Sequence, residues 1–393
     1  SGVKILFQAE SGSATTDSVY SNADGSYAVG LTDGIYTVHF SKIGYIPYTW
    51  PGSFTWGGDS YTIDDVTLQA GAIIEVSGRT NGIWYDEYQY RVIGDLEIES
   101  GSTLTIEPGT QVLFMDEYSM EIYGSLIAVG TEQDSIIFTS GQAVKDVLDW
   151  NGIRIYGGGD NNREIVFQYC DISYGGNGYE SSIIHASGFG SDSTTVAVKI
   201  LNSHIHHAST RSVYAYYSGI IVSDTKFSNW GNDQALYIRQ PYQCIIDNNH
   251  WVYSQGDNSS CPLTYNIWND GAAARVTKIT NNTFETGYHT AHIENDASDG
   301  VDSIFINNNT FINGSLYTET KYGNITVIEN NFFKQDECCN NTALSFSEQD
   351  ASIVRNNTIF NYSTGFSLSS NSSPVIENNL VVGKYGISGY LST

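Results

Sequence analysis

Short apolar runs return along the second half of the chain at nearly regular spacing, and each ends in a pair of asparagines. The pattern apolar, any residue, Asn-Asn, any residue, apolar occurs in KITNNTF, FINNNTF, VIENNFF, IVRNNTI and PVIENNL. The first asparagines of these pairs are 27, 22, 26 and 22 residues apart; they are Asn281, Asn308, Asn330, Asn356 and Asn378. Degenerate copies at Asn202, Asp224 and Asn248 extend the series toward the amino terminus. A repeat of about 20–30 residues is typical of a solenoid, in which each unit buries its apolar face against its neighbours.

The residues inside each repeat predict β-strands. Every unit holds two or three short runs rich in Val, Ile, Phe, Tyr and Thr, separated by Asn, Gly, Ser and Asp, and none shows helical periodicity. Three short strands in a repeat of this length predict one coil of a parallel β-helix. Asparagine suits the bends because it tolerates left-handed backbone angles and because its amide can bond the asparagine one coil away. We therefore expect bend asparagines such as Asn330 to form an amide ladder.

Residues 1–71 lack this repeat and predict a small β-sandwich. Five alternating stretches, GVKILFQAE, DSVYSN, SYAVGL, IYTVHFSKI and SYTIDDVTLQ, are joined by tight turns such as NADGS and LTDG. The string SNADGSYAVGLTDGIYTVHFSKIGYIPYT resembles the carboxypeptidase regulatory-like (prealbumin-like) family over residues 3–70. The resemblance implies a non-catalytic spacer domain. It also implies one strand more than this chain supplies before Gly2.

A second resemblance begins at residue 73. The stretches GSTLTIEPGTQVLF, GSLIAVGTEQDSIIFTS and WNGIRI are similar to the opening coils of secreted bacterial right-handed β-helix proteins. The similarity covers residues 73–160, and the asparagine repeats extend it to the carboxy terminus. It implies an all-β protein with a right-handed parallel β-helix over residues 72–393. It does not fix an activity, because such helices include polysaccharide lyases, hydrolases, adhesins and structural shafts.

The net charge and the cysteines bear on the possible partners and on the location of the protein. The net charge of −26 argues against a nucleic-acid partner and against an anionic membrane surface. No run approaches the ~18–20 apolar residues of a membrane span, so we expect no membrane insertion. The start at SGVKILF is typical of a mature or trimmed product. The five cysteines permit disulfides but give no framework. Cys244 and Cys261 flank a long insertion and are the candidate disulfide, while Cys338 and Cys339 could be surface thiols, a vicinal bridge or partners of Cys170. The resemblance to secreted solenoid proteins, which are acidic and rich in Asn and Tyr, implies an extracellular or cell-surface location.

Strand alternation after each bend predicts which side chains point outward. Because coils stack about 4.8 Å apart, these side chains would form one ladder along the helix. A polysaccharide or cell-surface glycan fits such a ladder, since aromatic faces stack on sugar C–H groups and polar groups bind hydroxyls and carboxylates. The alternative is that exposed tyrosine and threonine merely favour strands, and a register error of one residue would exchange inward and outward sides. The predicted outward residues are Arg154, His185, Tyr214, Tyr216, Tyr237, Arg239, Asn266, Trp268, His292, Glu294, Tyr317 and Glu319.

Catalysis would need more than a binding ladder. A lyase requires a base and a cation, for which Arg239, His292 and Tyr317 are the best set. A retaining glycoside hydrolase requires two carboxylates about 5–5.5 Å apart, and Glu294 and Glu319 lie one coil apart. The chain lacks the Asp-rich and Gly-His-Gly signatures of pectin-type hydrolases. Our first prediction is therefore a structural or adhesive β-helix that binds glycans, and the second is a polysaccharide lyase or hydrolase.

Two loops offer metal ligands. The stretch ENDASDGVD places Asp296, Asp299 and Asp302 together, and hard oxygen ligands suit calcium. A solvated acidic turn is the alternative, and we expect no other cofactor. The stretch HIHH places His204 beside two further histidines, but no carboxylate accompanies them in the sequence, so a polar bend is favoured over zinc.

Two further expectations concern the surface and the ends of the chain. Among the Asn-x-Ser/Thr sequons, Asn258 and Asn313 are expected in loops and are the better glycosylation acceptors. The last coil, YGISGYLST, stops without a cap. A solenoid usually covers its end with an atypical unit, so we expect self-association, as a subunit of a larger assembly, or continuation into a longer chain.

Overall fold

The computed structural model contains strands, turns and bends, and its described residues include no helix. It describes residues 2–12, 15–42, 45, 48–58, 62–157, 163–177, 181–188, 197–231, 233–241, 244–252, 261–267, 275–286, 290–298, 302–336, 341–347, 350–369 and 371–389. The prediction of an all-β chain with a parallel β-solenoid is confirmed. Within the described residues no helix has the length and apolar character needed to cross a membrane.

The described residues of the amino-terminal region form one antiparallel sheet of four strands. Its strands are β1 (Lys4–Gly12), β2 (Asp17–Tyr20), β3 (Gly34–Ser41) and β4 (Tyr48–Trp56), in the order β2-β1-β3-β4. The described residues of the two other expected strands, at 26–31 and 62–69, have no strand structure. Their apolar side chains still pack on the core of the sheet, through Tyr27, Val29, Leu31, Ile63, Val66 and Leu68. Within the described residues an irregular cover stands where the second sheet was expected, and the sandwich stays a prediction.

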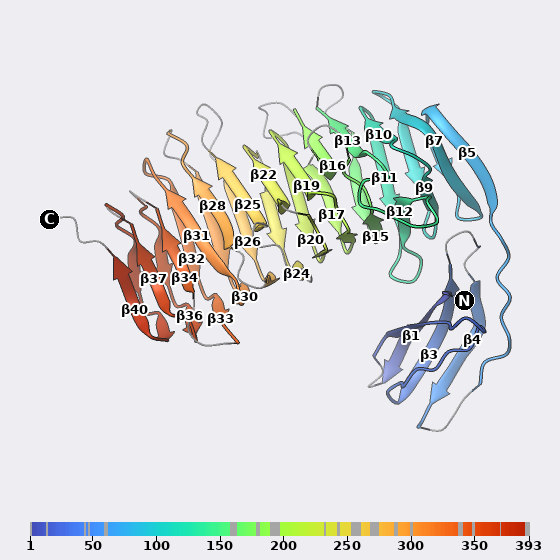
Figure 1. The fold of residues 1–393 in the computed structure, drawn as a ribbon, viewed down its shortest axis with the longest axis horizontal. Helices are drawn as coiled ribbons and strands as arrows, with labels where there is room; N and C mark the ends of the chain where they lie inside the picture. Colours follow the sequence, from blue (N-terminus) through green and yellow to red (C-terminus); the bar gives the residue numbers. More distant parts are fainter. Residues whose placement is uncertain are drawn as a thin grey trace.

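The solenoid begins with β5 (Ala72–Arg79) and β7 (Tyr88–Ile98), which pair in parallel. Each later coil contributes one strand to each of three faces (Figure 1). The first face is a 12-stranded sheet. Its strands are β6 (Gly82–Trp84), β8 (Thr103–Ile106), β11 (Ser125–Val129), β14 (Ile165–Gln168), β17 (Ala197–Leu201), β20 (Gly219–Ser223), β23 (Cys244–Asp247), β26 (Val276–Thr280), β29 (Ser303–Asn307), β32 (Ile325–Glu329), β35 (Ile353–Arg355) and β38 (Val375–Glu377).

The second and third faces belong to one continuous sheet that also contains β5 and β7. Strands of the second face are β9 (Gln111–Phe114), β12 (Ile136–Ser140), β15 (Cys170–Ser173), β18 (His204–His206), β21 (Lys226–Ser228), β24 (His250–Val252), β27 (Thr283–Glu285), β30 (Thr310–Ile312), β33 (Phe332–Lys334), β36 (Thr358–Phe360) and β39 (Leu380–Val382). Strands of the third face are β10 (Ser119–Ile122), β13 (Gly152–Tyr156), β16 (Ser182–Ser187), β19 (Arg211–Tyr216), β22 (Gln234–Arg239), β25 (Cys261–Ile267), β28 (Thr290–Asn295), β31 (Ser315–Thr320), β34 (Thr342–Phe346), β37 (Thr364–Leu368) and β40 (Tyr385–Gly389).

The bend between the first and second faces explains the paired asparagines. The first asparagine of each pair adopts the left-handed conformation, as in Asn281 with φ 57° and Asn330 with φ 56°. This part of the prediction is confirmed, since asparagine tolerates that conformation better than most residues. The side chains of these first asparagines are exposed, however. In Asn281 the amide reaches Asp247 of the coil before, with Nδ2 donating to Oδ1 at 2.8 Å.

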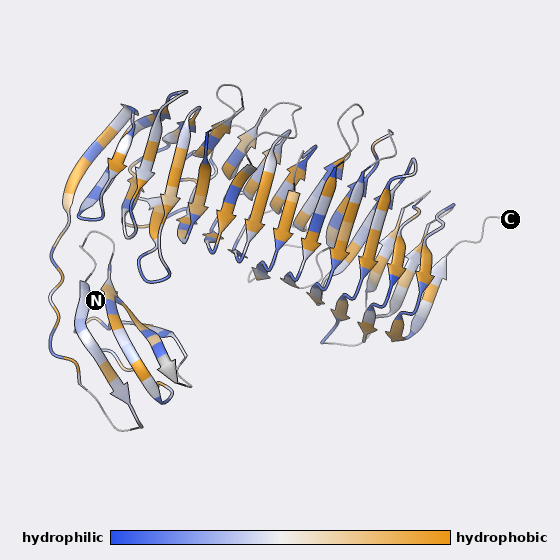
Figure 2. Ribbon diagram, turned by 180° about the vertical axis from the view of Figure 1, so that it is seen from behind, coloured by the Kyte–Doolittle hydropathy of each residue, from blue (hydrophilic) through white to orange (hydrophobic). Residues whose placement is uncertain are grey.

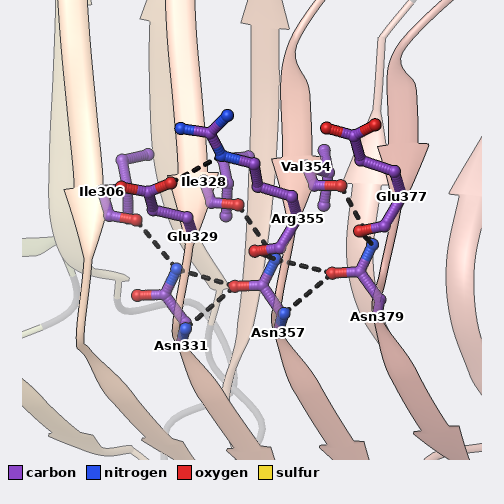
Figure 3. A network of polar contacts seen from close by, with 9 residues as sticks. All are labelled: Ile306, Ile328, Glu329, Asn331, Val354, Arg355, Asn357, Glu377 and Asn379. Carbon is purple, nitrogen blue, oxygen red and sulfur yellow. Dashed lines mark hydrogen bonds and ion pairs between the residues drawn. The ribbon is translucent and has the colours of Figure 1, made fainter.

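The buried amide ladder is formed by the second asparagine of each pair. The backbone N–H of Asn331 donates to Oδ1 of Asn357 at 2.9 Å, and Asn331 Nδ2 donates to the carbonyl of Ile306 at 2.8 Å (Figure 3). The left-handed residue turns the chain, so that the next side chain points inward. The expectation that Asn330 carries the ladder is therefore wrong by one residue. The ladder residues are Asn249, Asn282, Asn309, Asn331, Asn357 and Asn379.

An aromatic stack runs beside this ladder through the second face. It contains Phe227, Trp251, Phe284, Phe311 and Phe333, with ring centroids 5.1, 4.6, 4.7 and 4.5 Å apart. All five side chains are fully buried. Equivalent apolar positions repeat from coil to coil along the whole solenoid (Figure 2). The stack thus explains why an aromatic residue so often follows the paired asparagines.

The disulfide expected between Cys244 and Cys261 is not formed. Both cysteines are free thiols, and so is Cys170. Cys244 is buried on the first face, whereas Cys261 lies on the third face, where its Sγ contacts the Leu263 carbonyl oxygen at 3.1 Å. Burial raises the pKa of Cys261 to about 11. The two remaining cysteines, Cys338 and Cys339, lie outside the described residues.

The last described coil leaves apolar side chains open to solvent. Val375, Leu380 and Ile387 are more than half exposed, at 53, 58 and 57 %. They belong to β38, β39 and β40, one strand from each face. Self-association or continuation at this coil stays a prediction.

Candidate functional site

The predicted outward residues line up on the third face in two columns that follow the solenoid axis. Trp268 lies outside the described residues; every other predicted residue belongs to one column or the other. The first column consists of Arg154, His185, Tyr214, Tyr237, Thr264, His292, Tyr317, Ser345 and Ser367. The second consists of Tyr156, Ser187, Tyr216, Arg239, Asn266, Glu294 and Glu319. Strand register therefore brings together residues that are far apart in the sequence.

The aromatic rings that β16, β19 and β22 contribute to the first column stack on one another. The ring centroids of His185 and Tyr214 are 4.9 Å apart, and those of Tyr214 and Tyr237 are 5.0 Å apart. The guanidinium of Arg211 lies over both tyrosine rings, 5.5 and 5.4 Å from their centroids. His185 and Tyr214 are only 8 and 7 % exposed. The expectation that these two rings offer open faces to a sugar is therefore corrected, because neighbouring rings cover them.

Two arginines, Arg154 and Arg211, lie close enough to His185 to affect its pKa. Arg154 was expected to point into solvent, but it is buried and donates through Nη1 to the carbonyl of Ser182 at 2.8 Å. Burial, together with the charges of Arg154 and Arg211, lowers the pKa of His185 to about 4. His185 is therefore neutral near pH 7, and it acts as part of the ring stack.

The ring stack is interrupted at β25. Here the first column presents Thr264 between Tyr237 and His292, so the ring face of Tyr237 that points toward β25 meets a small polar side chain. The second column presents Asn266 between Arg239 and Glu294. Asn266 is only 9 % exposed, and its Oδ1 has no hydrogen-bond partner among the described residues. A buried acceptor of this kind costs about 1–3 kcal/mol unless it is satisfied. We call these six residues the β25 site.

A charged cluster follows on β28 and β31. Glu294 and Glu319 are register partners on adjacent strands. Each already has a neighbour: His292 Nε2 lies 3.0 Å from Glu294 Oε1, though without hydrogen-bond geometry, and Tyr317 OH donates to Glu319 Oε2 at 3.3 Å. Burial, with the charge of Glu319 as the next cause, raises the pKa of Tyr317. Glu319 is thus hydrogen-bonded and Glu294 lies against an imidazole, so the two are not a pair of free carboxylates.

Sequence reasoning missed one cation of this cluster. Lys321 follows directly after β31 and forms ion pairs with Glu319 and with Asp296, the latter at 3.6 Å. Burial raises the pKa of Asp296, and Lys321 opposes that rise. Lys321 lies beyond the alternating part of the strand, so the period-two pattern gave no signal for it.

Of the three aspartates of the expected calcium site, the structure describes Asp296 and Asp302, and both face a cation of the protein itself. Asp302 is buried, and its Oδ2 lies 3.3 Å from Nη1 of the buried Arg275, while its Oδ1 accepts from the Arg275 backbone N–H at 2.9 Å. Asp296 faces Lys321, and Asp299 lies outside the described residues. The Asp302 carboxylate thus compensates a buried guanidinium, and calcium at this loop stays a prediction.

The structure describes one of the two glycosylation candidates, Asn313. Asn258 lies outside the described residues. Asn313 occupies a solenoid bend with φ 58° and not an open loop. Its amide is bonded reciprocally to Asp336, with Nδ2 donating to Oδ2 at 2.9 Å and Oδ1 accepting from the Asp336 N–H at 2.9 Å. Attachment of a sugar at Asn313 would have to displace these bonds.

Away from the two columns, one pocket lies in the amino-terminal domain. It is lined by apolar residues of the sheet, among them Ile5, Phe7 and Phe54, and by the irregular cover at Tyr27 and Ile63. None of the predicted site residues lines it. It lies between the sheet and that cover.

One comparison with known proteins bears on this fold. Residues 77–184 match the model of a family described as "Pectate-lyase like beta helix domain". No curated protein and no solved structure matches the chain. The pectate-lyase-like similarity covers the first coils of the solenoid and ends within β16, so the β25 site lies beyond it. It agrees with the parallel β-solenoid and is compatible with a carbohydrate-related role.

Proposed function

We propose that this protein is an extracellular or cell-surface β-helix module that binds a polysaccharide along its third face without cleaving it. The observation that carries the proposal is the buried, unsatisfied Oδ1 of Asn266 at the interruption of the ring stack. A sugar hydroxyl is a donor that could satisfy it once the amide turns outward, because Oδ1 has almost no exposed surface in the free protein.

The surroundings of Asn266 suit a sugar ring. Thr264 leaves one face of Tyr237 without an aromatic neighbour in the column, and such a face can stack on sugar C–H groups. Arg239 and Glu294, on either side of Asn266, supply a donor and an acceptor for hydroxyl groups. The two columns continue along the axis with coils about 4.8 Å apart, so an extended polymer can contact several coils.

The charge of the protein favours a neutral glycan. The chain carries a net charge of −26, and Glu294 and Glu319 add negative charge to the third face itself. A polyuronate or a sulfated polymer would be repelled during approach. We therefore propose a neutral, hydroxyl-rich polysaccharide as the ligand class.

Affinity electrophoresis through gels containing individual neutral or acidic polysaccharides tests this proposal. We expect the wild-type protein to be retarded by at least one neutral polymer, and the Tyr237→Ala and Asn266→Ala variants to be retarded much less. Tyr85→Ala is the matched control, because Tyr85 is 43 % exposed on the solenoid but belongs to neither column. Equal retardation of all variants would contradict the proposed site, and circular dichroism shows whether each variant is folded.

A glycoside hydrolase acting on the same face is the second candidate. It is favoured by the register pairing of Glu294 with Glu319 and by the raised pKa of Asp296, which suits a general acid. Release of reducing ends from a polysaccharide, abolished by Glu319→Gln, would establish it. A lyase would instead produce unsaturated uronates with their own absorbance. Binding with neither product supports the non-catalytic module.

A further inference from the structure

A group of potential metal ligands lies on the second face, away from the two columns. Asp171 on β15 is the register partner of His204 on β18, and His206 lies two residues further on the same strand. One ligand atom from each side chain lies within 4.8 Å of the others. Among the described residues no other set of three His, Cys, Asp or Glu side chains is this close. The carboxylate that the HIHH sequence lacks is supplied one coil away.

We propose that Asp171, His204 and His206 form a zinc site that links two neighbouring coils. Asp171 Oδ1 lies 3.1 Å from His206 Nε2, and Asp171 Oδ2 lies 3.6 Å from His204 Nδ1. Ligand atoms at about 2.0–2.1 Å from a tetrahedral ion are about 3.3 Å from one another. The two measured separations fall on either side of that value, so an ion needs only a small adjustment of the side chains.

The nitrogen atoms that face away from Asp171 are already held. His204 Nε2 lies 2.8 Å from Ser228 Oγ, and His206 Nδ1 lies 2.6 Å from His207 Nδ1. Histidine ligands of metals almost always have such a partner on their other nitrogen, which fixes the ring and its tautomer. A plain surface histidine pair does not require it.

The outer end of this chain of contacts is also held in place. His207 is fixed by stacking on Tyr174, with ring centroids 4.6 Å apart. Its Nε2 lies 3.3 Å from the side-chain amide of Asn229. The rings beyond His206 are therefore held in place by contacts outside the proposed ligand set.

The site is open enough for an ion and for a further ligand. The side chains of Asp171 and His204 are 39 and 34 % exposed, and that of His206 is 15 % exposed. Three protein ligands leave a fourth position for water, as in zinc sites that have three protein ligands. Solvent can therefore reach the ion from the second face.

Two nearby lysines favour zinc over calcium and magnesium as the metal of this site. Lys226 is the register partner of His204 on the next coil. Lys145 lies over the ring of Tyr174, 5.4 Å from its centroid, and its charge acts on Asp171. Calcium and magnesium are held by several oxygens and by their charge, and two ammonium groups oppose that mode of binding. Imidazole nitrogens bind zinc through coordinate bonds, so zinc is the better match.

Calorimetric titration of the chelator-treated full chain with Zn²⁺ tests the proposal. We expect one ion per chain, and at least a tenfold loss of affinity in Asp171→Asn and in His206→Ala. Ser228→Ala keeps every ligand and should weaken binding by about 10–100-fold, as loss of a ring-orienting partner does. His250→Ala is the control, because His250 pairs with Glu285 at 3.3 Å on the same face without a second histidine.

Further outcomes distinguish a zinc site from a polar bend that binds no metal. Co²⁺ bound at the site should show the intense visible absorption of a tetrahedral complex, and it should be displaced by Zn²⁺. Absence of Zn²⁺ uptake by the wild type would overturn the proposal. Uptake that is equal in the wild type, Asp171→Asn and His206→Ala would overturn it as well, even if a variant is less stable by thermal melting.

Discussion

The backbone N–H of Asn331 donates to the side-chain oxygen of Asn357, 26 residues further along the chain, at 2.9 Å. The same bond recurs between successive coils, and each ladder amide also donates to a carbonyl of the coil before (Figure 3). Each inward asparagine therefore links its own coil to the coils on both sides, in a position from which water is excluded.

Asn331→Ala should lower the free energy of unfolding by about 1–3 kcal/mol, because it leaves buried backbone groups without partners. Asn330→Gly is the matched control one residue away, since glycine accepts the left-handed φ of 56° and the Asn330 side chain is exposed. Urea denaturation of both variants measures the difference. Equal stabilities would mean that the ladder contributes nothing.

The aromatic stack provides a second test of the core. Phe311→Ala should cost about 3–5 kcal/mol, the usual loss for a buried phenylalanine. Phe332→Ala changes a residue on the same face that is 38 % exposed, and its effect should stay within about 0.5 kcal/mol. Thermal melts of the two variants make the comparison, and similar shifts would contradict the assigned register.

The buried ion pair of Arg275 and Asp302 predicts a large effect from a small change. Asp302→Ala should destabilise the protein by about 3–5 kcal/mol, because it leaves the Arg275 guanidinium buried without its carboxylate. The double variant Arg275→Met, Asp302→Leu should recover much of that loss. A mild effect of Asp302→Ala would indicate that Asp302 is available for calcium after all.

The buried carboxyl of Asp350 predicts a pH dependence. Burial raises its pKa to about 6, whereas an unfolded aspartate has a pKa of about 3.9. Between these values the native state holds a proton that the unfolded state has lost, so this group's contribution to stability falls as pH rises from about 4 to 6. Asp350→Asn should remove this fall. The difference between wild type and variant in unfolding free energy, measured at pH 4.5 and 7, should change by about 2 kcal/mol.

Local patterns predicted the architecture well because they are repeated in every coil. The paired asparagines predicted the bends, and alternation placed Tyr237, His292 and Glu319 on one face. The inward amide was assigned to the wrong member of the pair because a left-handed residue at a bend breaks the alternation. The stretch SYAVGL alternates correctly, yet it packs on the core without forming a strand.

Contacts between coils were the part that the sequence could not supply. Asp171 meets His204 only through the register of β15 and β18, and no local pattern fixes the number of residues in the intervening loops. Lys321 and Arg211 approach the columns from beyond the alternating positions. Cys244 and Cys261 are close in sequence, but they belong to different faces of the solenoid.

Histidine footprinting tests most directly whether a polysaccharide binds at the β25 site. His292 lies in the site and His250 lies on the second face, and their side chains are similarly exposed, at 40 and 45 %. Diethyl pyrocarbonate should modify both at similar rates in the free protein. With a bound neutral polysaccharide, we predict that His292 is protected and His250 is not. Equal modification of the two histidines in the presence of a polymer that demonstrably binds would contradict the account.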